Sequence, residues 1–273
     1  MTEAVSVGVF DSGVGGLSVL REIRRQMPAA RLLYVADSRH APYGERSRSF
    51  IRQRAFHIAD FLLNQGIDAL VVACNTATAA AVIPLRHRLT LPVVGMEPAI
   101  KPGVSATHSG AVGVLATSGT LASARFAALL RRFDDRRRVL TQPCPGLVEQ
   151  VERGELTSLK TRRLLSRYLQ PLLQRGVDTL VLGCTHYPFL RPMIEEIAGR
   201  GVTLIDTGEA VARRLCEVLR LGDPAPGGEG ETLFWSSGEL QRGTATMRAL
   251  WDGPVDLRAL PEPPLPLSPR APD

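Results

Sequence analysis

Gly66-Ile67-Asp68-Ala69-Leu70-Val71-Val72-Ala73-Cys74 aligns without a gap on Gly176-Val177-Asp178-Thr179-Leu180-Val181-Leu182-Gly183-Cys184. Upstream, Val7-Gly8-Val9-Phe10-Asp11-Ser12 has a counterpart in Val112-Gly113-Val114-Leu115-Ala116-Thr117. The offsets of the two pairs, 110 and 105 residues, are nearly equal. Two matches at similar offsets predict a duplicated unit, and the period is too long for a solenoid of short repeats. We therefore expect two pseudo-equivalent domains.

Around these segments, short apolar runs alternate with longer helical patterns. The predicted strands are residues 5–10, 32–36, 69–73, 93–95, 111–115, 179–183 and 202–205. The predicted helices include residues 17–26, 47–65, 76–88, 121–133, 159–175 and 189–200. Fully apolar strands that alternate with helices are typical of an α/β protein with mainly parallel sheets covered on both faces.

The expected division of the chain follows this pattern. Residues 1–97 together with about 208–260 form the first α/β domain, and residues 98–207 form the second, with the active site in the cleft between them. The last segment, 261–273, is rich in proline and is expected to be a disordered or extended tail without a function of its own.

Composition and charge exclude several classes of protein. The N-terminus carries neither a basic n-region nor an apolar core, and no apolar run approaches the ~20 residues of a spanning helix. We therefore expect a cytoplasmic protein without a membrane partner. The formal charge of +6 comes mostly from scattered arginines without interleaved aromatic residues. This pattern favours a solvated surface, compatible with an anionic substrate, over a nucleic-acid interface.

The four cysteines, Cys74, Cys144, Cys184 and Cys216, form no CxxC pair, and structural disulfides are disfavoured in a reducing cytosol. Each is either a small buried hydrophobe or a reactive thiol. Cys74 and Cys184 follow equivalent strands of the two repeats. Because ligands bind at the carboxyl ends of parallel strands, these two thiols are expected to approach one cleft from opposite sides, leaving the other two cysteines outside it.

The residues that follow each thiol carry further signals. After Cys74, Asn75 and Thr76 are good helix caps, so this thiol is expected between a strand end and a helix N-terminus, where thiolate is favoured. After Cys184, Thr185 is a second candidate cap. The imidazole of His186 is near enough in sequence to interact with the thiol, although a lone histidine is more often structural.

Two loops border the expected cleft. Asp11-Ser12-Gly13-Val14-Gly15-Gly16 follows the first strand but matches neither the dinucleotide fingerprint nor the P-loop. Its backbone amides can instead hold a carboxylate, and Asp11 can meet an ammonium group or relay a proton. Pro42-Tyr43-Gly44 lies in the loop after the second strand and borders the same cleft.

These loops and the two cysteine motifs, Ala73-Cys74-Asn75-Thr76-Ala77-Thr78 and Leu182-Gly183-Cys184-Thr185-His186-Tyr187-Pro188, closely resemble glutamate racemases of the aspartate/glutamate racemase family. The resemblance runs in order over roughly residues 7–210. It implies a two-domain α/β fold, no cofactor, no metal, and interconversion of L- and D-glutamate for peptidoglycan synthesis and cell-wall biogenesis. It also implies a homodimer with glutamate as its small-molecule partner.

The same resemblance implies roles for individual residues. Cys74 and Cys184 are the acid/base pair, with Cys74 expected to deprotonate D-glutamate and Cys184 L-glutamate. Acidic or basic helpers are Asp11, His186, Asp37 and Glu152, with Glu149 a competing position for Glu152. The implied substrate contacts are Asp11, Ser12, Pro42, Tyr43, Gly44, Asn75, Thr76, Thr185 and His186.

Two thiols suit this chemistry because a single base would return the proton to the face that it left. Without pyridoxal phosphate, the cleft must supply oriented donors for the growing carboxylate charge. Three alternatives remain. The first is a two-cysteine racemase acting on aspartate or a hydantoin, and the second is a regulator that binds a small ligand without chemistry. The third is a metal site built from Cys74, Cys184 and His186, for which two opposed thiols are poorly placed.

Overall fold

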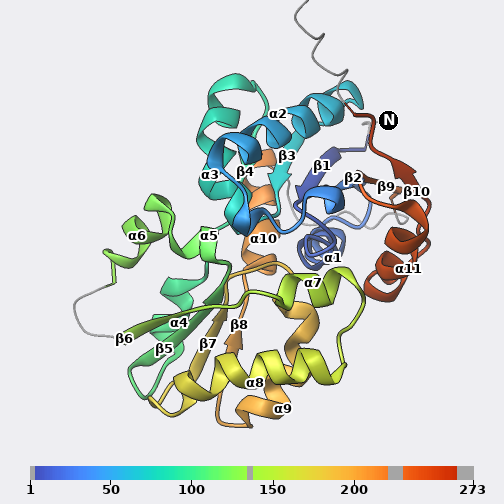
Figure 1. Cartoon of the computed structure of the whole chain (residues 1–273). Helices are drawn as coiled ribbons and strands as arrows, with labels where there is room; N and C mark the ends of the chain where they lie inside the picture. Colours follow the sequence, from blue (N-terminus) through green and yellow to red (C-terminus); the bar gives the residue numbers. More distant parts are fainter. Residues whose placement is uncertain (1–3, 134–137, 221–229, 263–273) are drawn as a thin grey trace, which may run out of the picture.

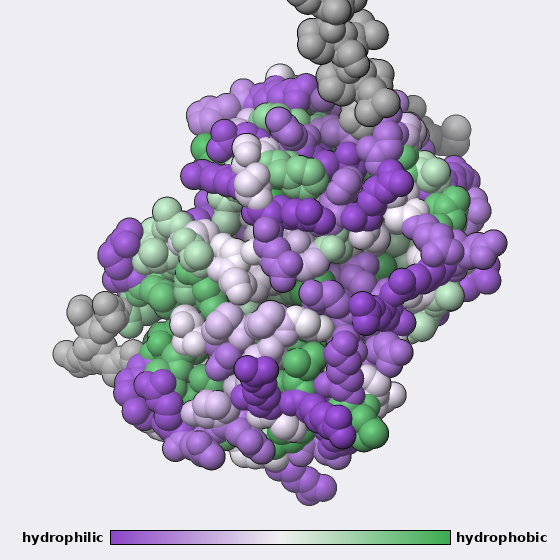
Figure 2. Space-filling view, in the orientation of Figure 1, coloured by the Kyte–Doolittle hydropathy of each residue, from purple (hydrophilic) through white to green (hydrophobic). Residues whose placement is uncertain are grey.

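The computed structural model describes residues 4–133, 138–220 and 230–262. Its two parallel sheets belong to two lobes that lie side by side (Figure 1). This architecture confirms the predicted α/β class. One cluster of buried hydrophobic residues contains side chains from both lobes, so the lobes share part of their core. Most of the visible face is hydrophilic, and hydrophobic side chains gather near α6 and β6 (Figure 2).

The first lobe contains a six-stranded sheet of order β10-β9-β2-β1-β3-β4. Its strands are β1 (Ser6–Asp11), β2 (Arg31–Ala36), β3 (Ala69–Val72), β4 (Val93–Val94), β9 (Thr232–Ser236) and β10 (Leu257–Ala259). The second lobe contains a four-stranded sheet of order β6-β5-β7-β8. Its strands are β5 (Ala111–Ala116), β6 (Arg138–Pro143), β7 (Thr179–Leu182) and β8 (Thr203–Ile205).

The register of the strands reproduces the internal repeat. In the first sheet Val7 pairs with Ala69, and in the second sheet Val112 pairs with Thr179. Val112 and Thr179 are the sequence counterparts of Val7 and Ala69. The two repeated segments of each unit are therefore adjacent central strands in identical register. Because parallel strands end at the same edge of a sheet, the residues after β1 and β3, and those after β5 and β7, are brought together.

Helices surround both sheets (Figure 1). In the first half of the chain they are α1 (Leu17–Gln26), α2 (Arg48–Asn64), α3 (Asn75–Arg88), α4 (Ile100–Ala106), α5 (Ser118–Leu121) and α6 (Ala124–Leu130). Later come α7 (Leu147–Glu152), α8 (Leu159–Leu173), α9 (Arg191–Ala198), α10 (Gly208–Leu219) and α11 (Leu240–Leu250). Short 3₁₀ segments are η1 (Ser38–His40), η2 (Tyr43–Glu45) and η3 (Tyr187–Leu190).

Local chemistry explains where the observed elements differ from the predicted ones. The helix predicted over 121–133 is two helices, because the Ser123 hydroxyl accepts from the Phe126 amide and starts α6 anew. The helix predicted over 189–200 begins as η3 and becomes α-helical only at Arg191. Strands β6, β9 and β10 were missed. Strand β6 is an edge strand without a buried side chain, β10 is an edge strand of three residues, and β9 has only a short apolar run, Leu233–Trp235.

The C-terminal segment is partly described. Leu260 donates its amide to the Ser236 carbonyl, and the Pro261 carbonyl lies 2.8 Å from Nε2 of His57. The first residues of the predicted tail therefore pack on the first lobe, and the rest of it, 263–273, lies outside the described residues. Among the helices of the described part, none combines the length and apolar character needed to cross a membrane.

Candidate active site

A small cavity lies where the carboxyl ends of the two central strand pairs face each other. Its lining residues are Ser12, Pro42, Tyr43, Gly44, Cys74, Asn75, Thr76, Thr117, Thr120, Val148, Gly183, Cys184, Thr185 and His186. Both lobes contribute, and both thiols face the cavity. Every residue that the sequence suggested as a substrate contact lines it except Asp11, which lies beneath Ser12. Cys144 and Cys216 are not among the lining residues.

Cys74 lies two residues after the end of β3 and is itself the N-cap of α3. Its sulfur accepts from the Ala77 amide at 3.4 Å and lies 3.8 Å from the Ser12 hydroxyl. The predicted position between strand and helix is confirmed, but the thiol takes the capping role that was suggested for Asn75 or Thr76. Burial, followed by the negative charge of Asp11, raises the pKa of Cys74 well above its usual range. The neutral thiol is therefore favoured, and the expectation of a thiolate at this helix N-terminus is wrong, because burial outweighs the effect of the helix.

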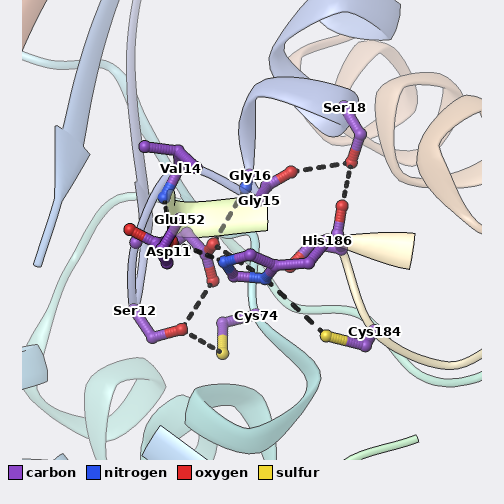
Figure 3. Close-up of polar contacts among 12 residues, drawn as sticks. Asp11, Ser12, Val14, Gly15, Gly16, Ser18, Cys74, Glu152, Cys184 and His186 are labelled. Atoms are coloured by element: carbon purple, nitrogen blue, oxygen red, sulfur yellow. Dashed lines mark hydrogen bonds and ion pairs between the residues drawn. The ribbon is translucent and has the colours of Figure 1, made fainter. Parts of the chain in front are cut away.

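Cys184 has a different environment. Its sulfur lies 3.7 Å from Nδ1 of His186 (Figure 3). The segment that follows is the 3₁₀ turn η3, which no side chain caps. The suggested capping role of Thr185 is therefore wrong: its carbonyl accepts from the Ser18 hydroxyl at 2.9 Å instead. This thiol has an imidazole where its counterpart has a helix N-terminus.

His186 connects Cys184 to a carboxylate. Its Nε2 lies 2.6 Å from Oε1 of Glu152, which also accepts from the Val14 amide at 2.7 Å. Burial alone would lower the pKa of His186. Hydrogen bonds to Cys184 and Glu152 outweigh that effect and raise the pKa well above its ordinary value, so the ring is held as imidazolium. Glu149 makes no such contact and lines a neighbouring pocket beside Cys144.

Asp11 and Asp37 lie outside the cavity lining. Asp11 is fully buried, accepts from the Gly16 amide at 2.9 Å, and lies 4.0 Å from Nδ1 of His186. Burial raises its pKa. Asp37 is paired with Arg54 at 2.7 Å and accepts from the hydroxyl of Tyr43. Asp11 is thus in reach of both thiol environments, whereas Asp37 reaches the cavity only through Tyr43.

Two features of the lining point to a polar ligand. Both amide atoms of the buried Asn75 side chain lack a hydrogen-bond partner in the described part of the protein, and buried polar groups are rarely left so. The Thr76 hydroxyl lies 2.9 Å from that of Thr117 and 3.0 Å from that of Thr120, which joins the lobes across the cavity. The predicted site residues did not include Thr117, Thr120, Val148 and Gly183. The internal repeat pairs Thr117 with Ser12 and could have found it.

The arrangement can move a proton across a bound molecule. Two thiols on different lobes face one cavity, and one of them is paired with a buried imidazolium. Among the described residues, no group of three or more histidine, cysteine or acidic side chains is arranged to hold a metal ion. Backbone amides at the start of α3 and Nδ2 of Asn75 supply donors for a carboxylate.

Residues 7–215 match the Asp/Glu/Hydantoin racemase family. The chain belongs to this family of racemases. Its relatives within the family include the glutamate racemase of Pseudomonas aeruginosa, 56% identical over 260 residues, which are 94% of this chain and 98% of that one. The glutamate racemase of Pseudomonas syringae pv. tomato is 60% identical over 233 residues, 85% of each chain.

Solved structures agree. Glutamate racemase isoform RacE1 from Bacillus anthracis superposes with a TM-score of 0.85 at 33% identity, over 96% of this chain and 98% of that one. Escherichia coli glutamate racemase, in complex with L-glutamate and the activator UDP-MurNAc-ala, gives 0.83 at 34% identity, over 94% and 98% of the two chains.

Proposed function

We propose that this protein interconverts L- and D-glutamate without a cofactor, with Cys74 and Cys184 as the acid/base pair. The observation that carries the proposal is the placement of the two thiols, which follow equivalent strands of two sheets and face one cavity. The substrate rests on the relatives, which are named glutamate racemases at 55–60% identity over most of the chain. An aspartate or hydantoin substrate remains the alternative within the family.

In the L-to-D direction, the Cys184 thiolate removes the Cα proton and the neutral Cys74 thiol returns a proton to the opposite face. The imidazolium of His186 stabilises the Cys184 thiolate, and Glu152 stabilises the imidazolium. The raised pKa of Cys74 suits its role as the acid in this direction. In the D-to-L direction the two thiols exchange roles, and Asp11 lies near both partners.

Negative charge moves onto the substrate α-carboxylate as the Cα proton leaves. Donors that are already oriented stabilise this charge without reorganisation. The unpartnered Asn75 amide, the Thr76 amide in the first turn of α3, and Ser12 and Thr185 are the groups we assign to this carboxylate and to the ammonium group. We assign Pro42, Tyr43 and Gly44, which line the cavity from a separate loop after β2, to the other end of the substrate.

Circular dichroism of L-glutamate incubated with the protein tests the proposal. The expected result is decay of the signal to zero with no added cofactor, since the two enantiomers have equal free energy. Parallel incubations with L-aspartate and a hydantoin should leave those signals unchanged. Racemisation of aspartate or the hydantoin but not of glutamate would contradict the substrate assignment, and no racemisation of any of the three would favour a binding role.

Three further assignments belong to the proposal. The product D-glutamate serves peptidoglycan synthesis in the cytoplasm. The two domains comprise residues 1–97 with about 208–260, and residues 98–207. This division is supported by the contacts of α10 with α1, β3 and β4 of the first lobe. The protein is also proposed to be a homodimer, which light scattering coupled to gel filtration tests directly.

A further inference from the structure

Arg54 of α2 is a buried cation that joins three segments far apart in the sequence. Its Nη2 and Nε contact the two carboxylate oxygens of Asp37 at 2.7 and 3.0 Å. Its Nη1 contacts Oε2 of Glu262 at 3.0 Å. The Arg54 side chain is only 9% exposed. The guanidinium is therefore shared between a carboxylate beside the cavity and one in the C-terminal segment.

Asp37 connects Arg54 to the loop of residues 42–44, which borders the cavity. It accepts from the Tyr43 hydroxyl, and Tyr43 is the first residue of η2. Tyr43 lines the cavity together with Pro42 before it and Gly44 after it. Burial would raise the pKa of Asp37, but hydrogen bonds from Arg54 and Tyr43 keep it below its ordinary value. Asp37 is therefore an anion at neutral pH, and both bonds to it are charge-assisted.

The loop that contains Tyr43 and Gly44 packs tightly against the second lobe. A Cβ atom added to Gly44 would lie 2.8 Å from Cβ of Thr117, and one added to Gly119 would lie 2.7 Å from the Gly44 carbonyl oxygen. Real Cβ atoms essentially never come so close. A small displacement of Tyr43 would therefore change the width of the cavity between the lobes.

We propose that Arg54 is a positioning residue for the Tyr43 loop and that Glu262, in the segment after β10, holds Arg54 in its two-sided contact. The inference rests on the proposed function, because it assigns the loop to one end of the substrate. A planar guanidinium can bind Asp37 with two donors while a third reaches Glu262, whereas the point charge of lysine cannot reproduce this fork. The C-terminal segment thereby contributes to substrate affinity without touching substrate.

Substitution of Glu262→Gln tests the proposal because it removes the charge and keeps the shape. The Glu262 side chain is 40% exposed, so fold and thermal midpoint should be unchanged. KM for glutamate should rise about threefold with kcat within about twofold, since the reacting atoms are untouched. The matched control is Asp256→Asn, which removes an exposed pair to Arg258 from the same C-terminal region and should leave KM unchanged.

Arg54→Lys extends the test to the residue itself. It should raise KM about tenfold, and the double variant with Glu262→Gln should be no worse than Arg54→Lys alone, because both changes act through one guanidinium. Backbone hydrogen exchange of residues 38–47 should be faster in Glu262→Gln and in Arg54→Lys than in the wild-type protein. In Asp256→Asn it should be unchanged. This readout does not need catalysis.

The two measurements separate failure of the inference from failure of the proposed function. Wild-type KM and wild-type exchange in Glu262→Gln would overturn the role of Glu262. Additive effects in the double variant would overturn the route through Arg54. If the wild-type protein did not racemise glutamate while exchange in 38–47 still responded, the substrate assignment would fail and the positioning of the loop would stand.

Discussion

The two lobes place a thiol at equivalent points of the same strand pattern, yet they surround it differently. Val7 pairs with Ala69 in one sheet as Val112 pairs with Thr179 in the other. Beyond the strands the likeness ends. Cys74 caps a 14-residue helix and has Ser12 and Asp11 as neighbours, whereas Cys184 precedes a 3₁₀ turn and has His186 backed by Glu152.

Duplication thus supplied two thiols at equivalent strand ends, while divergence of the neighbouring residues gave them different surroundings. Burial and the charge of Asp11 raise the pKa of Cys74, while the raised pKa of His186 holds a cation beside the sulfur of Cys184. A two-base racemase needs one thiol and one thiolate at the start of each turnover. Two identical environments would not determine which of the two cysteines is the thiolate.

The largest expected effect comes from removing either thiol. Cys74→Ala and Cys184→Ala should each lower racemisation by at least about 10³-fold, because acid/base catalysis by one positioned group is worth about 10²–10⁴ and neither group can replace the other. Polarimetry measures the loss, and far-ultraviolet circular dichroism checks that both variants remain folded.

Deuterium exchange in the same variants tests whether the thiol of each lobe acts on one enantiomer only. In heavy water, Cys74→Ala should exchange the Cα proton of L-glutamate only, and Cys184→Ala that of D-glutamate only, in each case without inversion. Mass spectrometry after chiral separation measures both. Full inversion with deuterium incorporation by either variant would contradict the two-base scheme.

A smaller effect is expected from Glu152→Gln, which perturbs only the Cys184 side. Loss of the carboxylate charge should lower the pKa of His186, so the imidazolium is lost at lower pH and the alkaline limb of kcat/KM moves down. At neutral pH, kcat/KM should fall about tenfold, and equally in both directions because the enantiomers have equal free energy. The control is Glu149→Gln, whose parent side chain does not contact His186; an equal effect there would refute the assignment.

Kinetic isotope effects in Glu152→Gln test whether Glu152 acts on the proton-transfer step at Cys184. In Glu152→Gln the step at Cys184 becomes slower, so the primary isotope effect should rise for α-deuterated L-glutamate and fall for α-deuterated D-glutamate. Unchanged isotope effects would place Glu152 outside proton transfer.

The smallest effect should follow Ser12→Ala, on the Cys74 side. The Ser12 hydroxyl lies 3.8 Å from the Cys74 sulfur and lowers its pKa, although burial and Asp11 dominate. Its loss should reduce kcat/KM about threefold and raise the isotope effect for the D-enantiomer, opposite to Glu152→Gln. Ser49→Ala, on the exposed start of α2, serves as the control. Equal isotope effects for both enantiomers would count against an assignment of Ser12 to one thiol.

Much of the fold was predictable because central strands are read from local pattern. The strands that carry the repeat, and the residues directly after them, were located to within one or two positions. Strands β6, β9 and β10 were not: the edge strands β6 and β10 are largely exposed, and β9, although it lies inside the sheet, has only three consecutive apolar residues. Helix ends were missed where a single hydroxyl decided them, as at Ser123.

The sequence by itself determined the duplicated α/β pattern, the pair of thiols at equivalent strand ends, and most of the polar residues that line the cavity. The strand pattern and the paired thiols follow from period, spacing and strand direction, which are properties of neighbouring residues, whereas the substrate contacts followed from the resemblance to glutamate racemases. Only the tertiary structure brought Glu152 to His186 across 34 residues, paired Arg54 with both Asp37 and Glu262, and placed Thr117 against Thr76. Such contacts depend on how separate elements pack, and no local pattern encodes a distance between them.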